Sequence, residues 1–256
     1  MHRHTYVGII PSRYMSSRFP GKPLADIAGK TMIQRVYERA KEVLDEVIVA
    51  TDDDRILQEV KGFGGDALLT SERHKSGTDR CAEALQKLEE IQTDVYAVVI
   101  NIQGDEPFIQ KEQIETLQSC FSDDNTQIAT LIKPIEDNDV IFDRNRPKVV
   151  IDKQGFAMFF SRSAIPNLRD VNEKEWHIRH RYFQHIGMYA YRRDVLLEIA
   201  KLNPTLLEKA ESLEQLRWLE YGYKIKTAVT GIESFGIDTP EDIEEAVRSG
   251  YIHDIG

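Results

Sequence analysis

The first hundred residues alternate short apolar runs with stretches in which apolar side chains recur every three or four positions. The runs with the length of strands lie at 6–10, 47–50 and 67–69, and the periodic stretches lie at 31–43, around 56–60 and around 81–88. Each strand is followed by a helix, which is the order of βαβ units. The pattern therefore predicts an α/β fold with a mostly parallel sheet.

The pattern changes after a nearly all-apolar run at 95–102, which is typical of a central strand. Runs at 148–151 and 156–160 are separated by Asp152-Lys153-Gln154-Gly155 and predict an antiparallel hairpin. The remaining expected elements are a helix around 114–121, strands at 128–132, 185–191 and 225–229, helices at 194–202 and 212–219, and a helix beginning at Pro240 after the N-cap Thr239. No repeat or linker marks a boundary, so we expect one domain over 1–256 with an antiparallel excursion at about 145–190.

Composition narrows the function classes. The chain of 256 residues is 41% hydrophobic and can bury a large core, while its net charge of −10 argues against a nucleic-acid or anionic-membrane binder. Cys81 and Cys120 each fall on the apolar side of an expected helix and are interpreted as buried thiols. The sequence shows no signal peptide or membrane span, so we expect a soluble cytoplasmic protein.

Cationic side chains gather in the loop that follows the first strand. Residues 11–23 contain Arg13, Arg18 and Lys22 with serines and glycine and have no hydrophobic periodicity. Open α/β sheets bind their ligands at the carboxyl ends of strands, where backbone N–H groups and fixed cations suit a polyphosphate. The alternative is an ordinary solvated loop.

A second loop, His74-Lys75-Ser76-Gly77-Thr78-Asp79-Arg80, follows the third strand. Its histidine, lysine and arginine around Ser-Gly-Thr suit a base and a phosphate, but Ser76 or Thr78 could be no more than the cap of the next helix. The aspartates at 52–54 could suggest a metal site, but helix capping explains them more simply. Carboxylates in the first turn of a helix cap its N-terminus and complement its dipole.

An acidic pair ends the central strand, in the segment Gln103-Gly104-Asp105-Glu106-Pro107. A carboxylate at the end of a buried strand needs a cation, a hydrogen-bond network or solvent, and Mg²⁺ is the natural partner beside phosphates. We therefore interpret Asp105 as a Mg²⁺ ligand, with a structural carboxylate as the alternative. Glu106 is interpreted as a turn residue or an outer neighbour of the metal, and Asp238 by itself as a turn residue.

Seven motifs in order resemble the 3-deoxy-D-manno-octulosonate (Kdo) cytidylyltransferases, also called CMP-Kdo synthetases. They are SRYMSSRFPGKPL, HKSGTDR, NIQGDEP, FFSR, HIGMYAYR, ESLEQLR and GIDTPED, and they extend from about residue 6 to 247. The resemblance implies a single Rossmann-like domain of the nucleotide-diphospho-sugar transferase type, with helices on both faces of a mixed, mostly parallel sheet. It also implies a homodimer, Mg²⁺ dependence and the reaction of CTP with Kdo to give CMP-Kdo and pyrophosphate for lipopolysaccharide synthesis.

The resemblance also assigns roles to residues. Catalysis is assigned to Arg13, Lys22, Asp105 and Asp238, of which Asp105 and Asp238 hold the metal. CTP binding is assigned to Ile10, Pro11, Ser12, Arg13, Arg18, Lys22, His74, Lys75, Ser76, Arg80 and Gln103. Sugar binding is assigned to Gln103, Arg162, His185, Tyr189, Glu211, Glu214 and Gln215. Arg162 would thereby supply the cation that a sugar carboxylate needs.

Three alternatives stay open at this point. The acceptor could be 8-amino-3,8-dideoxy-manno-octulosonate or a sialic acid instead of Kdo. A dinucleotide-dependent oxidoreductase would show G-x-G-x-x-G after the first strand, whereas this chain has Gly8 and then Gly21. A regulator without catalytic activity would be expected to lack a metal carboxylate or a loop arginine, and this chain has them all.

Overall fold

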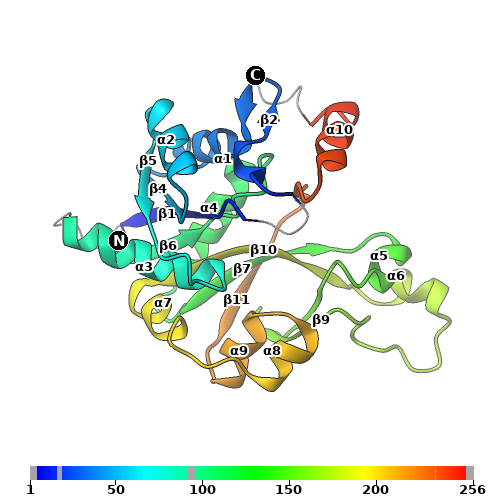
Figure 1. Cartoon of the computed structure of the whole chain (residues 1–256). Coiled ribbons are helices and arrows are strands. Elements are labelled where there is room, and N and C mark those ends of the chain that lie inside the picture. The colour runs from blue at the N-terminus through cyan, green and yellow to red at the C-terminus, as the bar shows by residue number, and fades with distance from the viewer. Residues whose placement is uncertain (1–4, 16–18, 92–95, 234, 252–256) are drawn as a thin grey trace. The chain divides into compact units, whose positions relative to one another are not determined.

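The computed structural model describes residues 5–15, 19–91, 96–233 and 235–251. The chain divides into two compact units: unit 1 is formed by Met1–Glu115 with Ser234–Gly256, and unit 2 by Thr116–Glu233. Figure 1 labels helices and strands of both units. The assignment of one domain to residues 1–256 stays a prediction.

Unit 1 contains the predicted parallel strands. In sheet order they are β6 (Val98–Asn101), β1 (Tyr6–Ser12), β4 (Glu46–Thr51) and β5 (Asp66–Leu69). β1 lies between two parallel neighbours, with Ile9 paired to Ile48 on one side and to Asn101 on the other. Gly8 allows close packing here, because a Cβ at this position would come within 2.7 Å of Leu44 Cδ1.

The helices of unit 1 follow their strands as the sequence predicts. They are α1 (Met32–Lys41), α2 (Asp54–Gly62), α3 (Gly77–Ile91), α4 (Lys111–Ser119), which continues into unit 2, and α10 (Pro240–Arg248). α1 buries the face that carries Ile33, Val36 and Ala40. α2 begins after Asp53, whose carboxylate accepts the Arg55 N–H at 2.9 Å, so the capping role is confirmed for this aspartate. The 3₁₀ turn η1 (Lys22–Leu24) and the short ribbon β2 (Asp26–Ile27) and β3 (Lys30–Thr31) join β1 to α1.

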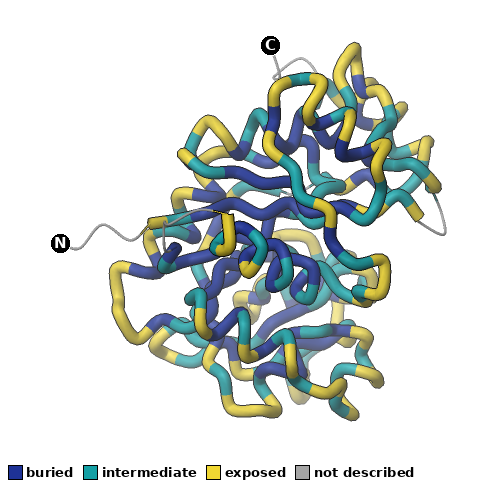
Figure 2. Tube along the Cα trace, turned by 60° about the vertical axis from the view of Figure 1, so that its left-hand side comes forward, coloured by how far each residue is buried: buried dark blue, intermediate teal, exposed yellow. Residues whose placement is uncertain are grey.

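Unit 2 contains the remaining strands that the sequence predicts. They are β7 (Ile128–Pro134), β8 (Lys148–Ile151), β9 (Ala157–Ser161), β10 (Phe183–Arg192) and β11 (Ile225–Val229). β10 runs antiparallel to β7 and β8, whereas β11 runs parallel to β7. The hairpin between β8 and β9 is confirmed, and the Asp152 N–H donates to Phe156 O at 2.8 Å across its turn. Figure 2 colours the Cα trace by residue burial and shows exposed residues at many of its turns.

One predicted helix of unit 2 is wrong in its extent. The sequence pattern predicts a helix at 212–219, but the structure has α8 (Leu206–Glu211) and α9 (Gln215–Glu220). Ser212 has φ of 52° and ends α8, because this left-handed conformation cannot continue a right-handed helix. The other helical elements are the turns η2 (Cys120–Ser122) and η3 (Glu173–Glu175) and the helices α5 (Asn138–Phe142), α6 (Trp176–Arg179) and α7 (Arg193–Ile199).

Both cysteines are buried and free, as predicted, although Cys120 lies in η2 and not in the helix before it. Across the described residues, we find no helix with the length and apolar character needed to span a bilayer.

Candidate active site

Unit 1 holds a cavity of about 320 Å³ at the carboxyl ends of its strands. It is lined by Pro11, Ser12, Arg13, Lys22, Pro23, His74, Lys75, Ser76, Gly77, Arg80, Gln103, Gly104, Asp105 and Asp238. The structure therefore brings together nearly all the residues to which CTP or metal binding is assigned. Ile10 is instead fully buried in β1, and Arg18 lies outside the described residues.

Parallel strand order explains why distant loops share this cavity. β1 and β6 are neighbours, so the loops that follow them leave the sheet at the same edge. The loops approach closely at Gly104, where a Cβ would lie 3.1 Å from Pro11 O. Glu106 donates its backbone N–H to Gln103 O at 3.2 Å, as expected of a turn residue.

The Lys22 ammonium joins the two predicted metal carboxylates. Lys22 Nζ lies 2.8 Å from Asp105 Oδ2 and 3.3 Å from Asp238 Oδ1, and it donates to Ile237 O at 2.8 Å. The lysine side chain is only 12% exposed, while the carboxylates of Asp105 and Asp238 are 39% and 48% exposed. The carboxylates therefore remain accessible to a ligand from the cavity.

Two backbone features hold this cluster in place. Gly21, at φ of 74°, precedes η1 and donates its N–H to Tyr14 O at 2.9 Å, which turns the chain so that Lys22 follows. Ile237 N–H donates to Asp105 O at 2.9 Å and fixes the C-terminal segment beside the end of β6. Local sequence left Asp238 as a turn residue, whereas the structure places it next to the Lys22 ammonium.

The donor set here suits a hard cation. Mg²⁺ in phosphate-transfer sites typically takes one or two protein carboxylates, with substrate oxygens and water completing its shell. Among the described residues, no group of three or more histidine, cysteine, aspartate or glutamate side chains forms a closed metal site. Asp105 and Asp238 therefore fit a metal that is shared with a phosphate ligand.

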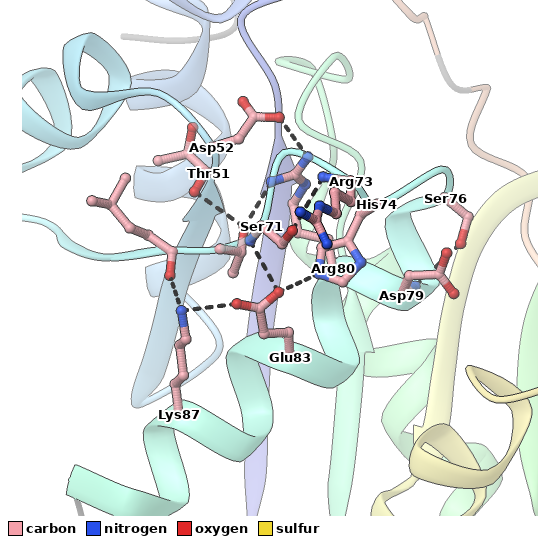
Figure 3. Close-up of polar contacts among 12 residues, drawn as sticks. Thr51, Asp52, Ser71, Arg73, His74, Ser76, Asp79, Arg80, Glu83 and Lys87 are labelled. Atoms are coloured by element: carbon pink, nitrogen blue, oxygen red, sulfur yellow. Dashed lines mark hydrogen bonds and ion pairs between the residues drawn. The ribbon is translucent and has the colours of Figure 1, made fainter.

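The second loop is held from α3 and from β4 (Figure 3). Arg80 is 4% exposed and donates to Thr70 Oγ1 and to Asp52 Oδ2, each at 2.7 Å. Through these contacts, Arg80 ties the second loop to the segment that follows β4. Ser76 Oγ accepts the Asp79 N–H at 3.1 Å, so Ser76 also caps α3.

Glu83 was missed by the sequence reasoning. Its Oε2 accepts from Ser71 N–H at 3.0 Å and contacts His74 Nε2, and its Oε1 lies 2.8 Å from Lys87 Nζ. Burial would raise the pKa of Glu83, but the hydrogen bonds from Lys87, Ser71 and His74 lower the pKa to about 2. The available signal was weak, because a glutamate four residues before a lysine is common on helices.

In unit 2, Arg162 and Glu211, both assigned to sugar binding, are adjacent. The Glu211 carboxylate accepts from Ser161 Oγ at 2.6 Å and from Arg162 N–H at 2.9 Å. The Arg162 guanidinium donates to three backbone carbonyls, Glu211 O at 2.7 Å, Arg144 O at 3.1 Å and Ser212 O at 3.3 Å. Arg162 thus ties the end of α8 to the segment before β8.

Several side chains with polar atoms are buried together on β10 and α9 of the same unit. His185 Nε2 lies 3.0 Å from Thr130 Oγ1, and burial lowers the His185 pKa to about 3, so the imidazole is neutral. Tyr189 packs between His185 and Trp218, with ring centroids 5.3 and 5.0 Å away, and burial raises the pKa of its hydroxyl.

Several buried polar atoms in this group have no hydrogen-bond partner in the described structure. They are Tyr189 Oη, Gln215 Nε2 and Trp218 Nε1. A buried donor without an acceptor is costly, so such atoms are candidates for ligand contact. Trp218, which the sequence reasoning did not select, lies three residues after Gln215 on α9, while Glu214 immediately precedes that helix.

Known proteins resemble the chain over nearly its whole length. Residues 7–225 match the family described as cytidylyltransferase. The 3-deoxy-manno-octulosonate cytidylyltransferase of Parabacteroides distasonis is 58% identical over 246 residues, covering 94% of this chain and 96% of the relative. The protein of the same name from Bacteroides thetaiotaomicron is 53% identical over 244 residues, covering 94% and 96%.

Solved structures show the same likeness. A CMP:2-keto-3-deoxy-manno-octonic acid synthetase complexed with CTP superposes with a TM-score of 0.88 at 43% identity, covering 98% of this chain and 99% of that one. A cytidylyltransferase from Leptospira borgpetersenii superposes with a TM-score of 0.61 at 14% identity, covering 96% and 86%, which shows a shared fold. The predicted mixed α/β fold of this class is thereby confirmed.

Proposed function

Because the chain belongs to the 3-deoxy-manno-octulosonate cytidylyltransferase family, we propose that it transfers CMP from CTP to the 2-hydroxyl of Kdo and releases pyrophosphate. The observation that carries this proposal is the cavity of unit 1, where cations of the first loop and two carboxylates face one space. Binding a triphosphate and assisting its cleavage need these two kinds of group together.

In this proposal, two loops bind different parts of the nucleotide. Arg13 and Lys22 contact the phosphates, and Arg18 is proposed to join them from the same loop. The backbone of the segment from Ile10 to Ser12 and the loop at His74–Ser76 read the cytosine, Gln103 faces the nucleotide or the sugar, and Arg80 supports the second loop. This division is supported by the lining of the cavity, to which both loops contribute.

Asp105 and Asp238 would hold Mg²⁺ beside the phosphates. When bound there, the ion would neutralise phosphate charge and lower the pKa of the attacking hydroxyl, which suits a tertiary sugar hydroxyl because it is a poor nucleophile. Lys22 already lies against both carboxylates, so its ammonium is close to the phosphates that the metal would share.

Within unit 2, the sugar acid is proposed to bind through Arg162, His185, Tyr189, Glu211, Glu214 and Gln215. In this set, the Tyr189 hydroxyl and the Gln215 amide have no acceptor among the described residues, so a ligand oxygen could supply one. The buried His185 ring is neutral and therefore adds no charge to the site. The 2-hydroxyl oxygen attacks the α-phosphorus in line, and the bond from phosphorus to the pyrophosphate oxygen breaks. The hydroxyl proton passes to solvent, and no covalent enzyme intermediate is required.

The proposal places the protein in the cytoplasm as a homodimer that activates Kdo for lipopolysaccharide synthesis. Residues 163–184 are proposed to form part of the interface. Ile178 in this segment is 72% exposed, so its side chain is available for contact with a partner subunit.

The acceptor is a separate question, because a group at the 8-position of the sugar would meet only one or two residues. Kdo is the proposed acceptor, and 8-amino-3,8-dideoxy-manno-octulosonate and sialic acid are the competitors. Comparing kcat/KM for the three acids with CTP decides among them, and a preference for either competitor would contradict the proposal.

The central experiment is pyrophosphate release from CTP, Kdo and Mg²⁺. The variant Asp105→Ala should lose turnover by about 10³-fold because it removes a metal ligand, while its circular dichroism and thermal unfolding stay near wild type. Asp124→Ala is the matched control, since Asp124 is 91% exposed in unit 2. A near-normal rate for Asp105→Ala would refute the metal assignment.

A further inference from the structure

Glu83 does not line the cavity, but it contacts the loop that does. This loop, residues 71–76 between β5 and α3, brings His74, Lys75 and Ser76 to the cavity wall. Figure 3 shows the Glu83 carboxylate on α3 facing the loop, with Lys87 on its other side. Glu83 therefore acts on the cavity only through the loop.

The two ends of the loop have their own attachments. At the start, Thr70 N–H donates to Thr51 O at 2.7 Å, and Arg80 Nη1 donates to Thr70 Oγ1. At the end, Ser76 caps α3 through Asp79 N–H. Between these ends, Glu83 holds the loop at Ser71 and His74.

The Glu83 carboxylate is well matched to this task. Its side chain is 23% exposed, so its hydrogen bonds face limited competition from water. The backbone of Ser71, the ring of His74 and the ammonium of Lys87 supply donors to its two oxygens. Without the carboxylate, Ser71 N–H and the His74 ring would lose their acceptor on α3, and the middle of the loop could move.

We propose that Glu83 is a positioning residue that sets the preference of the nucleotide site for cytosine. The proposal rests on the proposed function, in which the His74–Ser76 loop reads the base and the loop of Arg13 and Lys22 holds the phosphates. Hydrogen bonds to a base are directional, so their strength depends closely on the position of the loop that makes them. The attraction between cations and phosphates depends much less on such small shifts. Loosening the loop should therefore weaken discrimination between bases and leave phosphate binding intact.

The test is calorimetric binding of CTP and of UTP, each with Mg²⁺ and without sugar. Glu83→Ala should raise the Kd for CTP about tenfold and change the Kd for UTP less than about twofold, because uracil carries an oxo group where cytosine carries an amino group. Glu83→Gln keeps one oxygen as an acceptor for the loop but places its NH₂ group toward the Lys87 ammonium, which is also a donor. This variant should therefore raise the Kd for CTP only about threefold. Glu90→Ala, at an exposed position of the same helix, should bind both nucleotides as wild type does.

Hydrogen exchange separates positioning from general destabilisation. In Glu83→Ala, the amides of residues 71–76 should exchange faster while those of β1 and β4 keep their protection. Equal weakening of CTP and UTP, or unchanged CTP binding in a folded Glu83→Ala, overturns the proposal. Where Glu83→Ala does not fold, wild-type CTP affinity in Glu83→Gln overturns it. Failure of the wild-type protein to bind CTP would instead overturn the proposed function.

Discussion

His185 shows at the scale of one residue how burial fixes a charge state. The imidazole lies on β10, packs against Phe160 and Tyr189, and contacts Thr130 as its polar partner. Protonation would place a positive charge in this apolar surrounding, so the pKa is lowered to about 3. The residue thus presents a neutral ring to any ligand at neutral pH.

This burial predicts a pH-dependent stability. The pKa of His185 is about 6.5 in the unfolded chain and about 3 in the folded one, so the unfolded state binds more protons between these values. The contribution of the neutral His185 ring to the free energy of unfolding is fully present above about pH 6.5. It falls by about 1.4 kcal/mol for each pH unit below that value. Urea unfolding from about pH 7 to about pH 5 should therefore show a steeper loss for wild type than for His185→Gln.

The exposed His180 provides the control for this comparison. His180→Gln removes a histidine from the same unit and should keep the wild-type slope. The slope is the quantity to compare, because the glutamine changes packing and shifts absolute stability at every pH. Identical slopes in wild type and His185→Gln would show that the buried ring is not held neutral.

At the scale of elements, the pair α8 and α9 depends on one ion pair. Arg217 of α9 donates through Nε to Glu208 Oε2 of α8 at 2.7 Å, and through Nη1 to Leu202 O at 3.0 Å. The side chains of Arg217 and Glu208 are 10% and 15% exposed. Burial opposes ionisation of Glu208, but the Arg217 hydrogen bonds prevail and its pKa is lowered.

Removing one partner should destabilise unit 2 and disturb the proposed sugar site. Arg217→Met removes the ion-pair partner of Glu208 and, among the described residues, leaves only the Thr205 N–H as a donor to this carboxylate, so it should lower the free energy of unfolding by about 3 kcal/mol. Because α8 and α9 carry Glu211 and Gln215, the KM for Kdo should rise, while calorimetric CTP binding should stay unchanged. Lys209→Met, at an exposed position of α8, should leave both quantities at wild type, and a rise in Kd for CTP would contradict the prediction.

The limits of sequence reasoning are also clearest in elements. The strands β1, β4 and β6 of unit 1 were predictable because strands buried on both faces must be apolar nearly throughout. The start of α9 at Gln215 was not, because Leu213 and Leu216 have the spacing of a helix that begins at Ser212, and nothing local demands the left-handed conformation of Ser212. The helix α8 was also missed, because it has no buried residue and therefore no apolar face that the pattern could show. Glu83 escaped for a related reason: its partners Ser71 and His74 lie on a loop whose path depends on the fold.

At the scale of the whole molecule, the proposed homodimer gives a direct test. Sedimentation equilibrium should show twice the chain mass of 29.4 kDa. Ile178→Asp places a charge in the proposed interface segment and should weaken self-association at least about tenfold, because desolvating an unpaired charge is costly. Ile91→Asp, at a 70% exposed position of unit 1, is the matched control. A wild-type monomer at micromolar concentration would contradict the proposal.

The cluster of Lys22, Asp105 and Asp238 joins segments that are far apart in the sequence. Lys22 and Asp238 are 216 positions apart, yet both belong to unit 1, and Ile237 packs in one apolar cluster with Ile27 and Phe108. During synthesis on the ribosome, the first 115 residues emerge long before this returning segment does. Unit 1 can therefore begin to fold early, but its nucleotide site stays incomplete until the segment around Asp238 has left the exit tunnel. A stalled nascent chain that ends before Asp238 would lack one of the two carboxylates on which the proposed metal depends.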